Sequence, residues 1–116
     1  MARVITVGAA QLGPVEKSES RTSVVTRMLR LMEAAKRKGC DLLVFPELAL
    51  TTFFPRWYMT DQAEIDQWFE AEMPNSDTEP LFDMARQSNM AFHLGYAELC
   101  TESDQTHHYN LSLIHI

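Results

Sequence analysis

The sequence predicts an α/β fold, because short apolar runs alternate along the chain with segments that have the period of an amphipathic helix. The apolar runs at residues 4–10, 41–45 and 91–97 have the length and composition of buried strands. Between them, residues 20–38 and 80–89 place apolar side chains at three- and four-residue steps, as helices do. This alternation excludes a helical bundle and a sandwich made of strands alone.

The first helix has recognisable ends. It is expected at residues 20–38, after a strand that Gly13-Pro14 terminates. Ser18 or Ser20 can serve as its N-cap, and Gly39 suits the left-handed position just after its last turn. Six residues form its apolar face, which we assign to the core: Val24, Val25, Met28, Leu31, Met32 and Ala35.

A segment without helical or strand period follows the second strand. Residues 48–58 place four aromatic residues beside Pro55, so we expect a structured loop. A second helix is expected at residues 61–72, where Asp61 and Glu64 resemble a capping box.

The last part of the chain predicts a helix and a hairpin. Residues 73–77 form a loop, and a helix begins near Pro80 and ends near Asn89. The third strand, at residues 91–97, is joined through a polar turn at residues 101–106 to a fourth strand at residues 108–116.

Composition and charge exclude several classes of protein. The 116 residues are 46% hydrophobic and 22% charged, which excludes disorder. The net charge of −6 argues against a nucleic-acid partner. The densest basic cluster, Lys36-Arg37-Lys38, falls at a helix C-terminus, where cations complement the helix dipole.

No apolar stretch approaches the ~20 residues that span a bilayer, and no signal peptide is recognisable at the N-terminus. We therefore expect a cytoplasmic protein without a membrane partner. In that compartment Cys40 and Cys100 are expected to be free thiols.

The candidate for chemistry is Glu47, in the segment Phe45-Pro46-Glu47. In open α/β sheets, ligands bind beyond the carboxyl ends of strands, which is where this carboxylate falls. Pro46 ends the strand, and apolar residues follow Glu47, so we expect a poorly solvated carboxylate suited to proton transfer. On position alone, an ion-pair partner or a helix cap is the commoner role for such a glutamate.

Four segments resemble the opening of a nitrilase-superfamily (carbon–nitrogen hydrolase) domain: residues 8–14, 39–48, 95–96 and 108–110. The resemblance implies the N-terminal part of an α-β-β-α sandwich, with two sheets packed face to face. It also implies that Glu47 is the general base of a Glu–Lys–Cys triad that needs no metal and no organic cofactor. A full-length protein of this kind is expected to form a homo-oligomer.

The aromatic loop narrows the resemblance. Residues 51–58 are most similar to the N-carbamoyl-D-amino-acid amidohydrolases, or D-carbamoylases. This implies hydrolysis of a small N-carbamoyl-D-amino acid to a D-amino acid, carbon dioxide and ammonia. Two alternatives remain: another amidase, nitrilase or ureidopropionase of the superfamily, and a short interaction module without catalysis.

The resemblance places the triad lysine and cysteine after the fourth strand. Lys38, Cys40 and Cys100 do not fall at those positions, so we expect this chain to be inactive by itself. We interpret residues 1–110 as the N-terminal portion of a truncated carbon–nitrogen hydrolase domain. Residues 111–116 match the translation of a common transposase adapter, so we expect them to be a non-native tail.

Several other residues have simpler interpretations. Adjacent histidines in a strand point to opposite faces, so His107 and His108 are not expected to bind a metal together. Glu98 is expected to hold a structural hydrogen bond, and Asn110 to lie near the site as a non-catalytic support. The loop aromatics fit either the core or a pocket wall: Phe53, Phe54 and Trp57.

Overall fold

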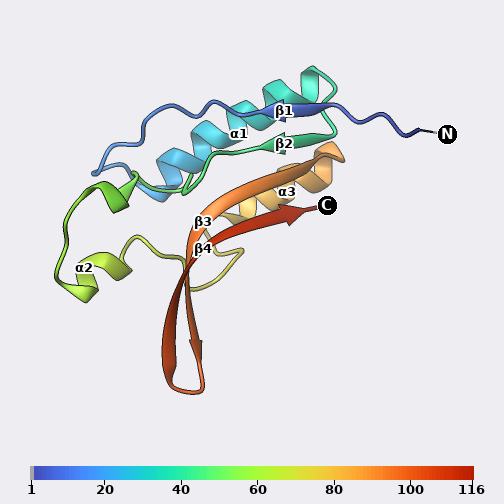
Figure 1. Ribbon diagram of the computed structural model, residues 1–116. Helices are drawn as coiled ribbons and strands as arrows, with labels where there is room; N and C mark the ends of the chain where they lie inside the picture. Colours follow the sequence, from blue (N-terminus) through green and yellow to red (C-terminus); the bar gives the residue numbers. More distant parts are fainter. Residues whose placement is uncertain (1) are drawn as a thin grey trace.

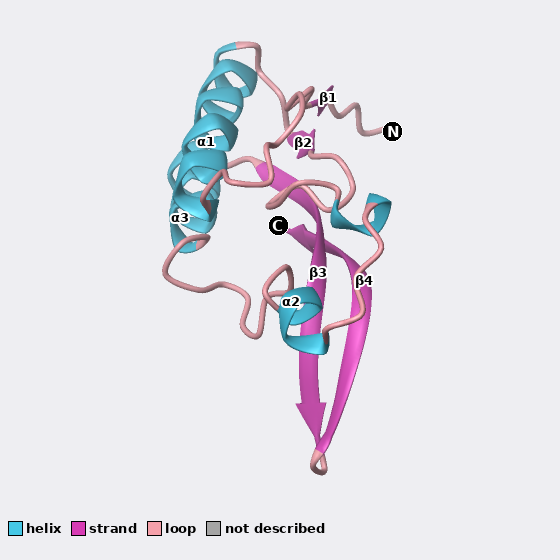
Figure 2. Cartoon of the chain, turned by 90° about the vertical axis from the view of Figure 1, so that its left-hand side faces the viewer, coloured by secondary structure: helices cyan, strands magenta, loops and turns pink. Residues whose placement is uncertain are grey.

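A computed structural model describes residues 2–116 and confirms the α/β fold: a mixed sheet with two helices packed on one face (Figures 1 and 2). Within these residues the strands lie in the order β1-β2-β3-β4, with β1, β2 and β3 parallel and β4 antiparallel to β3. The strands are β1 (Val7–Ala9), β2 (Leu42–Val44), β3 (Ala91–Glu102) and β4 (Gln105–His115). The α-helices are α1 (Arg21–Arg37), α2 (Gln62–Asp66) and α3 (Glu79–Ser88).

The ends of α1 and α3 follow from local chemistry. Ser20, not Ser18, is the N-cap of α1, and its side chain accepts a hydrogen bond from the Ser23 backbone N–H at 3.1 Å. After α1, Gly39 has a φ of +74°, a conformation that glycine adopts without strain. Asn89 ends α3 in the same left-handed region, with a φ of 50°.

The second helix is shorter than the sequence predicts. Asp61 caps α2 through the Ala63 N–H, but the helix ends at Asp66 instead of continuing to residue 72. The chain leaves the helix because Glu70 pairs with the edge of β3. Its N–H donates to the Ala97 carbonyl at 2.7 Å, and its carbonyl accepts from the Leu99 N–H at 2.9 Å.

β3 runs to Glu102 instead of ending near residue 97, because it stays paired with β4 as far as Glu102 and Gln105. The hairpin turn is correspondingly tighter than expected. It consists of Ser103 and Asp104, with φ values of 49° and 62°. Two consecutive residues with positive φ match the right-handed twist of the flanking strands.

The first strand differs most from its prediction as a buried strand. β1 covers Val7–Ala9 rather than residues 4–10, and Val4 and Val7 are 88% and 52% exposed. β1 is an edge strand, and Val7 lies on the side of the sheet opposite to α1 and α3. On that side α2 packs only at the far end of β4, where Gln62 and Asp66 contact His108.

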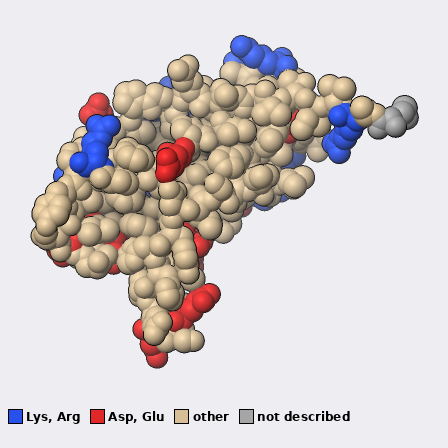
Figure 3. All heavy atoms as spheres, viewed as in Figure 1, with Lys and Arg blue, Asp and Glu red and all other residues tan. Residues whose placement is uncertain are grey.

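The sheet therefore has two unlike faces. The covered face packs against α1 and α3 and presents Leu43, Phe92, Leu94, Tyr96 and His115. The open face presents the alternate residues Val7, Leu42, Val44, His93 and Ile114. Figure 3 views the open face: uncharged surface predominates there, and acidic side chains gather at the end of the β3–β4 hairpin.

No helix in the described part of the chain has both the length and the hydrophobicity that crossing a bilayer demands.

Candidate active site

Glu47 lies just beyond the carboxyl end of β2, as its sequence position predicts. The Phe45 N–H still pairs with β3, donating to the His93 carbonyl at 3.0 Å, and Pro46 then has no N–H to continue the ladder. The expectation of poor solvation is wrong for this chain, because the Glu47 side chain is exposed. The apolar residues that follow turn back into the core and leave the carboxylate on the open side: Leu48, Ala49 and Leu50.

Two backbone features hold Glu47 in this place. Leu48 has a φ of 48°, an uncommon conformation for a leucine, and its side chain is only 5% exposed. The backbone of residues 46–48 crosses β3 at Gly95. A Cβ atom on Gly95 would lie 3.0 Å from the Glu47 Cα and 3.1 Å from the Pro46 carbonyl oxygen. The sequence shows this glycine but not its reason, which is the close approach of two segments far apart in the chain.

Asn110 contacts the carboxylate directly. Its Nδ2 donates to Glu47 Oε1 at 2.6 Å, joining residues 63 positions apart. On β4, Asn110 pairs with Ala97, which places it on the open face of the sheet. The expectation that Asn110 lies near the site is confirmed.

A hollow of about 160 Å³ adjoins Glu47. Its wall comes from the segment after β1 and from the loop after Glu47, and includes Pro14, Thr52, Phe53 and Arg56. A small polar molecule beside the carboxylate would contact both segments.

The aromatic residues of the loop differ in their surroundings: one lines the hollow, and another is buried in a hydrophobic cluster. Phe53 is 44% exposed and lines the hollow, whereas Phe54 is 7% exposed and stacks on Trp68, with ring centroids 6.2 Å apart. Trp57 packs beside Phe54 and Trp68, and two cationic side chains lie over its ring. Lys17 Nζ lies 5.1 Å and Arg56 Cζ 5.6 Å from its ring centroid.

Glu98 has the structural role expected of it, since Tyr96 Oη donates to its Oε1 at 2.9 Å. Burial, and then the neighbouring Glu98 carboxylate, raise the pKa of Tyr96 above its ordinary value.

The two histidines have separate surroundings. His108 Nε2 lies 2.7 Å from Asp66 Oδ1, and His107 stacks on Tyr109. Within residues 2–116, no three histidine, cysteine or acidic side chains gather as a metal site would require.

Both cysteines are free and lie away from a strand-to-helix turn. Cys40 sits where α1 leads into β2, and Cys100 pairs with His107 in the hairpin. Burial, followed by the charge of Glu102, raises the pKa of the Cys100 thiol, which disfavours the reactive thiolate.

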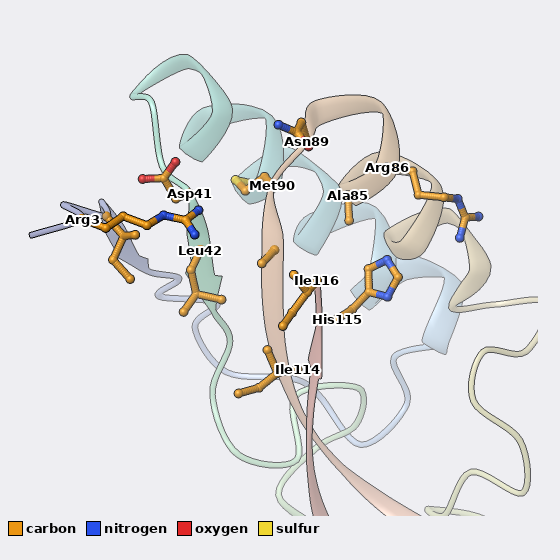
Figure 4. Close-up of a pocket in the computed structure, with 12 residues that line it drawn as sticks. Arg3, Asp41, Leu42, Ala85, Arg86, Asn89, Met90, Ile114, His115 and Ile116 are labelled. Carbon is orange, nitrogen blue, oxygen red and sulfur yellow. The ribbon is translucent and has the colours of Figure 1, made fainter. Parts of the chain in front are cut away.

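A larger hollow, of about 830 Å³, lies at the opposite end of the sheet (Figure 4). Arg3, Asp41, Leu42 and Met90 line it near the amino ends of β2 and β3, and His115 and Ile116 line it from the end of β4. It is not the candidate site, because it lies at the amino ends of the parallel strands, whereas ligands bind beyond their carboxyl ends.

Comparison with known proteins adds two findings. A model of the carbon-nitrogen hydrolase family matches residues 6–114. The fold is similar to part of a crystal structure of a glutamine-dependent NAD(+) synthetase from Cytophaga hutchinsonii, with a TM-score of 0.59 and 21% sequence identity. That similarity covers 95% of this chain but 17% of the synthetase chain. At this identity, it shows a shared fold.

Proposed function

This chain belongs to the carbon-nitrogen hydrolase family, and from that premise we propose that Glu47 is the general base in the hydrolysis of an N-carbamoyl-D-amino acid. The observation that carries the proposal is the place of the carboxylate. Glu47 is exposed beyond the carboxyl end of β2, lines a hollow and is held by Asn110.

We propose that Glu47 acts together with a cysteine nucleophile and a lysine of the complete enzyme. Glu47 takes the thiol proton, and the thiolate attacks the carbonyl carbon of the ureido group. The lysine stabilises the oxyanion that forms. The leaving nitrogen departs with the proton that Glu47 returns, and the cysteine keeps the acyl group. Glu47 then deprotonates the water that releases this group, so that one water is consumed for each amino acid, carbon dioxide and ammonia formed.

The charges around the hollow support a substrate that carries a carboxylate. Arg56 lines the hollow, and Lys17 lies over the same Trp57 ring as Arg56. Neither cation is in an ion pair within the described residues. An N-carbamoyl amino acid has such a carboxylate, and a simple nitrile or aliphatic amide does not.

The test is a substrate panel on the enzyme encoded by the complete gene. We expect ammonia release from N-carbamoyl-D-amino acids to exceed that from the L-isomers, N-carbamoyl-β-alanine, aliphatic amides, nitriles and glutamine. Preference for any of the others would assign the protein to a different activity of the family. Glutamine is included because of the synthetase that shares the fold.

The role of Glu47 is tested by Glu47→Gln, which keeps the shape and removes the base. We expect kcat to fall by about 10²- to 10⁴-fold. The matched control is Glu16→Gln, an exposed glutamate outside the hollow, which should retain wild-type activity. A Glu47→Gln enzyme with normal kcat would refute the proposal. We further propose that the complete enzyme is a cytoplasmic homo-oligomer.

A further inference from the structure

The hydrogen bond between Asn110 and Glu47 has a defined direction. A carboxylate only accepts hydrogen bonds, so the amide group of Asn110 must present its NH₂ to Glu47 Oε1. The bond is short, at 2.6 Å, as expected when the acceptor is charged.

The same contact makes the two carboxylate oxygens unequal. Oε1 is held by Asn110, whereas Oε2 has no partner within residues 2–116. The backbone on either side of the carboxylate is held as well, by the left-handed turn at Leu48 and by the contact with Gly95. A side chain fixed at its backbone and at one oxygen has little freedom to rotate.

We propose that Asn110 is a positioning residue: it holds Oε1 of Glu47 so that Oε2 alone exchanges a proton with the nucleophile and then with water. Asn110 acts through Glu47 and does not itself touch the substrate. The inference rests on the proposed function of Glu47 as the base.

The test uses the complete enzyme and two substitutions of similar size. Asn110→Leu removes the donor, and we expect kcat to fall by up to about 10²-fold while KM changes little. Asn110→Asp keeps the size of the side chain but replaces the donating NH₂ with a carboxylate oxygen, which cannot donate to Glu47 Oε1, so kcat should fall here as well.

The matched control is Tyr109→Phe, because Tyr109 is the neighbour of Asn110 on β4 and its hydroxyl makes no hydrogen bond within the described residues. It should leave kcat and KM unchanged. Thermal unfolding of each variant separates loss of the base from loss of the fold. Folded Asn110 variants with a wild-type kcat, or with a change in KM alone, would overturn the inference.

A second measurement works even in an inactive enzyme. Iodoacetamide alkylates the nucleophilic cysteine at a rate that depends on its activation by the base. Asn110→Leu should change this rate when Glu47 is present and have no effect in the Glu47→Gln background. Equal effects in both backgrounds would contradict the inference. If Glu47→Gln is inactive while Asn110→Leu behaves as wild type, the positioning role fails and the proposed function stands; if Glu47→Gln is fully active, both fail.

Discussion

The two faces of the sheet differ in what they contribute. On the covered face, Phe92 and Leu94 are fully buried against the helices. On the open face, Val7 and Ile114 are 52% and 60% exposed, and Asn110 meets Glu47. Side chains alternate between the two faces along a strand, so a residue buried on one face places the next residue in the chain on the other face. The covered face stabilises the fold, and the open face presents the candidate chemistry.

The largest effect expected from this comparison is on stability. Phe92→Ala removes a fully buried ring that packs edge-to-face against Phe45 and Phe82, and should lower the free energy of unfolding of this chain by about 3 to 5 kcal/mol. Val7→Ala on the open face is the control and should cost less than about 1 kcal/mol, because Val7 is half exposed. Urea denaturation at low protein concentration measures both. Equal costs would contradict the distinction between the faces.

The next prediction concerns the point where the faces meet. Gly95 lies between the buried residues Leu94 and Tyr96, so β3 cannot shift to accommodate a side chain. Gly95→Ala should push the Glu47 backbone away at a cost of about 1 to 3 kcal/mol, and should reduce the activity of the complete enzyme.

Gly8→Ala is the matched control for Gly95→Ala. A Cβ on Gly8 would lie 3.0 Å from Cys40 Sγ and 3.1 Å from Leu43 Cδ1, which are side-chain atoms that can move. It should cost less stability and leave the activity unchanged. The comparison is made by urea denaturation and steady-state kinetics. If Gly8→Ala impaired activity as much as Gly95→Ala, the contact with Glu47 would not be the cause.

How much the sequence predicts depends on the range of the interaction. The caps at Ser20 and Asn89 are predictable because a cap bonds within a few residues. Glu47 is predictable because strand and proline are its neighbours. The predicted end of α2 was wrong because Glu70 pairs with Glu98 of β3, which lies 28 positions further along the chain. The exposure of Glu47 and of β1 depends on what covers the open face, which no local pattern encodes.

The hydrogen bond from Asn110 to Glu47 is predictable from the sequence only in part. The resemblance to a family singles out both residues, and Asn110 does lie beside Glu47, as expected. Its contact with one carboxylate oxygen is a product of strand register, since Asn110 must pair with Ala97 for its side chain to reach Glu47. A shift of one residue would turn it to the covered face.

The smallest predicted effect is the pH dependence of the contact that joins α2 to β4. Hydrogen bonds from Gln62 and then from His108 lower the pKa of Asp66 below its ordinary value. A carboxyl group with a lowered pKa in the folded state adds stability above its unfolded pKa of about 3.9, and this contribution is lost as the pH falls through the folded value. Asp66→Asn should therefore lower the thermal midpoint of this chain at pH 6 and have no effect at pH 2.

A second variant, Gln62→Ala, removes the larger cause of the lowered Asp66 pKa. In that background, the pH range over which Asp66→Asn changes the thermal midpoint should be narrower. The effect is small because the side chains of Asp66 and His108 are 33% and 30% exposed, so water screens their interaction. His108 lies on the open face, two residues from Asn110 on β4. A pH-dependent loss as large as that caused by Phe92→Ala would mean that the open face, and not the helix-covered core, dominates the stability of the chain.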